Sequence, residues 1–299
     1  MPTYTEINYN SRGEIALYST TKTYDVRYIV NFYRLNNSGR ADRYVDTSLV
    51  MTRTIGNPSR IDGDILDCSF SANIKKGSYR IVAWTDYVDV GSSEDKYYVT
   101  DDFAEIYLNT SIEHSGNNDY RDAFRGTTLL DMEGDNEVVV EMMRPVGKYQ
   151  FIATDLDRLV KNMSSKATRE DIMRSISQQD YKVKFTYSGF MPCAYNLLDD
   201  FNADSDTNVS FYGEISVLSD SEAQLGFDYV FMNDDDGAVD VGLVILNKNG
   251  EVMASTNSIS VPMTQGKLTT VRGDFFTAKG SGGIGVNPAF NGDYNIYVD

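Results

Sequence analysis

Apolar and polar residues alternate along several stretches of the chain, as they do in strands that bury one face. From Tyr24 to Phe32 every second residue is apolar, and the polar residues Asp25, Arg27 and Asn31 lie between them. The same period of two returns at 181–187, 225–231 and 239–245. This period predicts half-buried β-strands. We therefore expect strands at all four places, with Leu225, Phe227, Tyr229 and Phe231 on one face of their strand.

Shorter apolar stretches predict further strands. They lie at 76–84, where a strand follows a glycine turn, at 138–142, at 149–153 and at 291–299. The pair Asn249-Gly250 follows the alternating stretch that ends at Ile245, and Asn-Gly is the strongest short hairpin signal. We expect a hairpin there.

Helical spacing appears in one part of the chain. Apolar residues recur at helical intervals from Leu156 to Met163, and Thr154 stands three residues before Asp157. Thr168 and Asp171 repeat this capping pattern ahead of a second helical stretch. Helices are therefore expected within 154–176, as an insertion between strands.

The length of 299 residues exceeds the size at which one hydrophobic core usually stops growing. Two domains of about 150 residues each are expected. The strand pattern restarts after Pro145, which favours a boundary near Met143. We predict an all-β chain of two β-sandwich domains, 1–143 and 144–299, with a short helical insertion at about 154–176 in the second.

Composition and charge exclude several classes of function. The net charge of −17 would repel phosphate backbones, so nucleic acid is not an expected partner. The single histidine, His114, stands in a polar run typical of a loop, and the cysteines Cys68 and Cys193 belong to no CxxC or Cys/His cluster. We expect no catalytic residue, no cofactor and no disulfide. Two carboxylates at glycosidase spacing would escape detection in a sequence with 44 acidic residues.

Two acidic segments are weak candidates for calcium ligands. Asp204, Asp206 and Asn208 alternate as calcium ligands do, but Ile215 stands where an EF-hand has glutamate. Asp234 and Asp236 lie in an acidic turn between two expected strands. The glycine-rich stretch 280–285 lacks the Lys-Ser/Thr pair of a phosphate loop and is expected to be a surface loop. Trp84, in a predicted strand, is expected in the core rather than on a sugar-binding surface.

Several segments, taken in order, resemble the fimbrillin-like proteins of Bacteroidales, in particular the lipoproteins grouped with the fimbrial anchors. These segments are 24–30, 77–87, Arg121-Asp122-Ala123-Phe124, 144–149, 151–155, Val261-Pro262 and 268–273. The resemblance implies two transthyretin-like β-sandwich domains, export as a lipoprotein to the outer membrane and cell surface, and a structural function in fimbriae. The lipid-bearing cysteine and leader of that family have no counterpart in this sequence, so contact with a membrane is expected only through such an anchor.

Two functions of different class follow. The first is a fimbrial subunit, tip or anchor, whose partners are other fimbrial subunits. The alternative is a surface lipoprotein that binds a glycan or another ligand on a host or bacterial surface. Neither function requires catalysis.

Assembly by strand complementation would use the ends of the chain. Ile15 and Leu17 share one face of a short extended stretch, as do Tyr294, Ile296 and Val298 near the other end. The resemblance implies that stalk subunits lose their first strand by proteolysis after an arginine, and Arg12 is the best-placed candidate. Because a charge is costly in an apolar groove, replacing Ile296 and Val298 by Asp is expected to destabilise the second domain or block assembly.

Overall fold

The computed structural model describes residues 3–8, 24–54, 69, 71–163, 168–233 and 237–278. For residues 3–8 it describes the backbone only. Within these ranges the regular elements are strands, apart from two short helices and a 3-10 turn (Asp119–Arg121). The strands before residue 143 are β1 (Thr3–Asn8), β2 (Tyr24–Arg34), β3 (Thr47–Thr54), β4 (Gly77–Asp89), β5 (Tyr98–Val99), β6 (Ile106–Leu108) and β7 (Phe124–Met132).

The part of the chain after residue 143 begins with β8 (Val146–Ala153), followed by α1 (Leu156–Met163) and α2 (Arg169–Ser177). The strands that follow are β9 (Lys182–Tyr187), β10 (Met191–Asn196), β11 (Phe201–Asp206), β12 (Ser210–Gly213), β13 (Ser216–Val217), β14 (Ala223–Phe231), β15 (Gly237–Leu246), β16 (Val252–Ser255), β17 (Ile259–Met263) and β18 (Lys267–Gly273). The predicted all-β class is confirmed, and the helices lie where helical spacing predicted them. A transthyretin-like topology stays a prediction.

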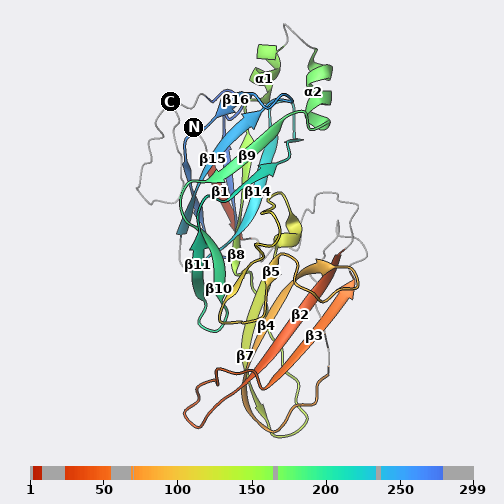
Figure 1. Cartoon of the computed structure of the whole chain (residues 1–299), viewed down its shortest axis with the longest axis vertical. Helices are drawn as coiled ribbons and strands as arrows, with labels where there is room; N and C mark the ends of the chain where they lie inside the picture. The colour runs from red at the N-terminus through yellow and green to blue at the C-terminus, as the bar shows by residue number, and fades with distance from the viewer. Residues whose placement is uncertain are drawn as a thin grey trace.

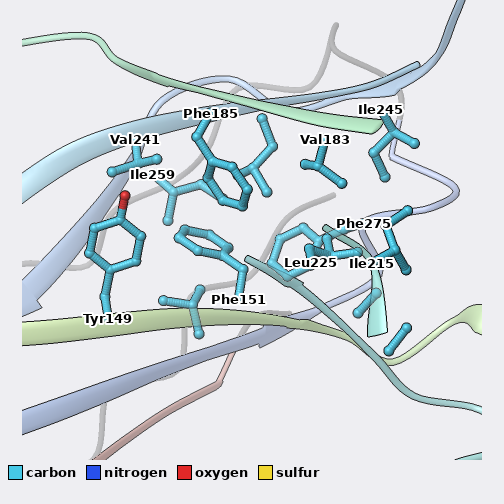
Figure 2. Close-up of a cluster of buried hydrophobic side chains, with 14 of the residues drawn as sticks. Tyr149, Phe151, Val183, Phe185, Ile215, Leu225, Val241, Ile245, Ile259 and Phe275 are labelled. Atoms are coloured by element: carbon cyan, nitrogen blue, oxygen red, sulfur yellow. The ribbon is translucent and has the colours of Figure 1, made fainter. Parts of the chain in front are cut away.

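Two facing sheets form a sandwich in the second half. One has the strand order β1-β18-β8-β14-β13, and the other has the order β12-β9-β15-β16, with β17 also paired to β15. Their facing side chains build one core, in which Phe151 of β8 meets Phe185 of β9 edge to face at 5.6 Å between ring centroids. Figure 2 shows Tyr149 and Phe151 projecting from one sheet toward Phe185 and Val241 of the other.

In the first half, four strands form a sheet with the order β3-β2-β4-β7. β2 was expected to be half-buried, but it is buried on both faces. Of the polar side chains expected in solvent, Arg27 contacts Asp86, directly opposite on β4, at 2.6 Å, and Asp25 accepts a hydrogen bond from the backbone nitrogen of Gly91. Burial of Arg27 and Asp86 is possible because their charges compensate each other.

Two pairings join the halves. β1, from the start of the chain, pairs antiparallel with β18, and β6 pairs antiparallel with β10 in a third sheet, β11-β10-β6-β5. Figure 1 shows the resulting elongated molecule, with α1 and α2 at one end and β2, β3 and β7 at the other. The domain boundary near residue 143 stays a prediction, although residues 3–8 and 106–108 pair with strands beyond it.

A bulge in β14 changes which face its side chains occupy. The pairing of β14 with β8 shifts register between Gln224 and Gly226. Leu225 consequently lies in the core of the second sandwich, whereas Phe227, Tyr229 and Phe231 lie in the cluster that contains Trp84. The prediction that all four share one face is wrong, because an inserted residue reverses the alternation.

Several local predictions have clear outcomes. The Thr168–Asp171 capping box is present at the start of α2, and Gly250, with φ of +79°, forms the turn of the β15–β16 hairpin. Trp84 is fully buried, as expected. No strand forms at 138–142; the next residue, Met143, makes an isolated bridge to Arg125. The expected strand at 291–299 lies outside the described residues.

Candidate functional site

Six buried charged residues hold the two halves of the chain together, and we call them the polar clasp. They are Asp119, Arg121, Asp122, Arg144, Lys148 and Asp228. The first three come from one short segment, whose turn begins at Asn118, where the side chain accepts a hydrogen bond from the backbone nitrogen of Tyr120. Its three charged side chains contact three different residues of the second half.

Each charged residue of this segment has its own partner beyond residue 143. Arg121 lies 2.8 Å from Asp228 of β14, Lys148 of β8 lies 2.6 Å from Asp119, and Arg144 lies 2.9 Å from Asp122. None of these six side chains is more than 7% exposed. Three ion pairs removed from water therefore connect the first half to β8, to β14 and to Arg144, two residues before β8.

His114 extends the clasp. It lies in a loop, as expected, but its side chain is only 14% exposed, which the polar sequence around it did not indicate. Its Nε2 lies 2.7 Å from Asp228 and 2.8 Å from Arg121. The hydroxyl of Tyr187 donates to the same carboxylate at 2.7 Å, and that of Tyr149 donates to Tyr187 at 3.0 Å. His114 is thus a structural member of the interface between the halves.

The electrostatics of the clasp favour a charged Asp228. Burial by itself raises the pKa of this carboxyl, but Arg121 and His114 outweigh burial, so the pKa lies below its usual range. Burial raises the pKa of Tyr187 and of Tyr149 well above the usual value, so both phenols stay protonated and can donate. The side chains of Arg121, His114, Asp228, Tyr187 and Tyr149 are thus linked by hydrogen bonds, an arrangement that fixes their geometry.

The second candidate site, after the polar clasp, is the edge of the sheet at β18. β18 runs parallel to β8 on one side, and β1 covers its other side from Thr3 opposite Arg272 to Asn8 opposite Lys267. Most of β18 is buried. A strand from a distant part of the sequence thus completes this edge.

Most residues proposed for assembly lie outside the described part of the chain. These are Arg12, Ile15, Leu17, Tyr294, Ile296 and Val298, and their assignments stay predictions. The strand that the structure places at the edge, β1, precedes Arg12 and was not among the strands expected from the sequence. Its sequence, TYTEIN, alternates weakly, which is the signal that could have identified it.

Two of the calcium candidates lie in the described part of the chain, and the other two lie outside it. Asp204 and Asp206 lie on β11, an exposed strand beside Cys193. Burial, together with these two carboxylates, raises the pKa of the Cys193 thiol to about 11. Asp234, Asp236 and Cys68 lie outside the described residues. Within the described ranges, no group of three or more His, Cys, Asp or Glu side chains is arranged to hold a metal ion.

The sequence segments that carried the family resemblance meet in the clasp. Arg121 and Asp122 belong to one of these segments, and Arg144 and Lys148 belong to another. No chemistry was assigned to them from the sequence.

In the part of the chain that the structure describes, no helix is long and apolar enough to cross a membrane.

The chain is similar to a family and to several solved structures. A family model described as a family of unknown function (DUF6562) matches residues 2–299. No curated protein matches the chain.

Three solved structures illustrate the structural similarity. A candidate polysaccharide binding protein (DUF1812) from Bacteroides thetaiotaomicron is 12% identical, with a TM-score of 0.41 over 79% of this chain and 73% of that one. A candidate cell adhesion protein from Bacteroides eggerthii is 14% identical, with a TM-score of 0.40 over 94% and 90%. A fimbrial assembly protein from Parabacteroides distasonis is 10% identical, with a TM-score of 0.35 over 100% and 98%.

Proposed function

The chain belongs to the family of unknown function DUF6562, and from this premise we propose that it is a non-enzymatic surface protein that assembles with other subunits by strand complementation. The observation that carries the proposal is the pairing of β1 with β18. The proposal adds a mechanism of assembly to the fimbrial function that the sequence resemblance implies.

An edge completed by a strand from elsewhere in the sequence is suited to exchange. Backbone N–H and C=O groups supply much of the affinity when a strand is added to a sheet, so a strand from another chain can make similar bonds. β1 spans six residues, and the chain next described begins at Tyr24. Up to fifteen residues, 9–23, connect the two, which is long enough for β1 to leave its edge without moving β2.

Cleavage after Arg12 would separate β1 from the rest of the chain. The edge of β18 would then be available to a strand of a second subunit. A subunit that keeps β1 would instead end an assembly or anchor it. Attachment to the outer membrane by a lipid, and exposure on the cell surface, belong to the same proposal.

The test compares the full chain with a chain that begins at Gly13. We expect the full chain to be a monomer by light scattering. The shortened chain is expected to bind a synthetic peptide of residues 1–12 and to regain thermal stability when it does, because the peptide restores the missing backbone hydrogen bonds.

A second experiment uses full-length variants and the same peptide. Proline donates no backbone hydrogen bond, and successive residues of a strand direct their N–H groups to opposite sides, so either Thr5→Pro or Glu6→Pro must disturb the bonds to β18. One of these variants should bind the peptide, and the conservative Thr5→Ser should not. Absence of peptide binding by the shortened chain and by both proline variants would show that β18 does not accept strands.

A further inference from the structure

A buried lysine and a buried aspartate of the polar clasp lie in direct contact. Nζ of Lys148, on β8, is 2.6 Å from Oδ1 of Asp119, in the 3-10 turn of the first half. The two side chains are only 7% and 3% exposed. The other two ion pairs of the clasp contain arginine, whose guanidinium stays charged and does not act as a nucleophile. Of the three pairs in the clasp, the lysine pair alone therefore places a nucleophile beside a carboxyl group.

Two aromatic rings from β14 cover the lysine amine. Nζ of Lys148 lies 4.2 Å from the centroid of the Phe227 ring and 4.8 Å from that of the Tyr229 ring. Burial favours a neutral amine and a neutral carboxyl group over the two ions, because only the ions lose strong hydration. A proton can therefore pass from Lys148 to Asp119 across their contact, which leaves an uncharged amine beside an uncharged carboxyl group.

The hydroxyl of Tyr229 completes the arrangement. It donates a hydrogen bond to the same oxygen, Oδ1 of Asp119, at 2.8 Å. A hydroxyl donates and accepts at once, so it can give a proton to a departing oxygen and take one from a nitrogen nearby. The fold holds the amine and the phenol against one carboxyl group, and this fixed arrangement raises the effective concentration of the reacting groups.

We propose that Lys148 and Asp119 condense into an amide cross-link between β8 and the 3-10 turn. Nζ of Lys148 forms a bond to Cγ of Asp119, and the bond from Cγ to Oδ1 breaks. The ammonium group gives up two protons: the first passes directly to Oδ1, and the second reaches it through the Tyr229 hydroxyl, so that this oxygen leaves as water. One amide and one water molecule replace the ammonium and the carboxylate, and the balance needs no oxidant, reductant or cofactor.

The cross-link goes beyond the proposed function, because it forms within one chain and does not depend on strand exchange at β18. It ties the first half of the chain to the second by a covalent bond. The turn then stays attached to β8 even when the chain is unfolded, which an ion pair does not achieve.

The test is the mass of the full chain, measured under denaturing conditions. We expect a mass lower than that of the sequence by one water molecule, whereas an ion pair leaves the full mass. Tryptic digestion should release a branched peptide that contains both Asp119 and Lys148, because trypsin does not cleave after an acylated lysine. This measurement needs no substitution, so it does not depend on whether a variant folds.

Three variants locate the chemistry. Lys148→Arg keeps the positive charge but removes the nucleophilic amine, so its chain should show the full mass. Lys96→Arg is the matched control, because Lys96 contacts Asp89 at 2.8 Å in a pair whose side chains are 32% and 61% exposed. This control should still lose one water molecule. Tyr229→Phe keeps a ring beside Lys148 and removes the hydroxyl, so it should lower the cross-linked fraction.

The outcomes that contradict the proposal are equally definite. Full mass for the unsubstituted chain, a water loss that maps to other residues, or a water loss that persists in Lys148→Arg would each overturn it. An unchanged cross-linked fraction in Tyr229→Phe would overturn the proton transfer through Tyr229.

Discussion

The Arg121 guanidinium lies 2.8 Å from the carboxylate of Asp228, and the two residues are 107 positions apart in the sequence. Their side chains are 4% and 1% exposed. A buried pair at this distance forms only when the segment before β7 is pressed against β14. The pair therefore reports directly on how the two halves of the chain are joined.

Removing one partner of this pair should strongly destabilise the chain. We expect Asp228→Asn or Arg121→Met to lower the free energy of unfolding by about 3–5 kcal/mol, because each leaves the other charge buried without compensation. Urea unfolding followed by tyrosine and tryptophan fluorescence measures the change. Asp220→Asn, which removes the fully exposed partner of Arg169, is the control and should have no measurable effect. A small loss in both clasp variants would mean that water reaches the pair.

Acid should weaken the clasp in a defined pH range. The pKa of Asp228 is lower in the folded chain than its ordinary value, since Arg121 and His114 outweigh the effect of burial. Its contribution to stability is therefore complete above the unfolded pKa of about 3.9 and is lost as the pH falls through the folded pKa. Below about pH 4 the urea midpoint of the natural chain should fall more steeply than that of Asp228→Asn. Parallel pH profiles for the two proteins would contradict this.

The contact of the 109–118 loop with the second sandwich has no room for a methyl group at Gly116. A Cβ there would lie 2.1 Å from Cε2 of Phe211, whose ring is stacked on Phe185 at 4.8 Å. Gly116→Ala should therefore lower the free energy of unfolding by about 1–3 kcal/mol. Gly134, where a Cβ would meet nothing within 4 Å, is the matched control. Equal stability of the two alanine variants, measured by thermal unfolding, would argue against this packing.

The capping box of α2 should contribute measurably to local order. Thr168 Oγ1 accepts a hydrogen bond from the backbone nitrogen of Asp171, and the Asp171 carboxylate accepts one from the backbone nitrogen of Thr168. Thr168→Ala should lower stability by about 0.5–2 kcal/mol, and Thr168→Ser should restore most of it. Hydrogen exchange of the α2 amides would show the effect. Unchanged exchange in the alanine variant would mean that tertiary contacts alone hold the helix.

Sequence patterns predicted elements well where one face is buried. β9 and β15 alternate in burial as their residues do, because each packs one face on the sandwich core. The prediction failed for β2, where the second face is also buried and Arg27 forms an ion pair with Asp86. It also failed at 138–142, where apolar residues form no strand.

The candidate sites were predicted less well than the fold. The sequence indicated that His114 lies in a loop. It did not indicate the contact with Asp228, because that residue is 114 positions away in the sequence.

The sequence by itself determined the all-β class, the helical insertion and the turn at Gly250, because hydrophobic period, capping and turn geometry are local properties of neighbouring residues. Only the tertiary structure decided that β1 joins β18, that β6 joins β10, and that Arg121 meets Asp228. Partners so far apart are chosen by packing and by the pairing of buried charges. A local pattern of polar and apolar residues does not record which distant residue will supply the opposite charge.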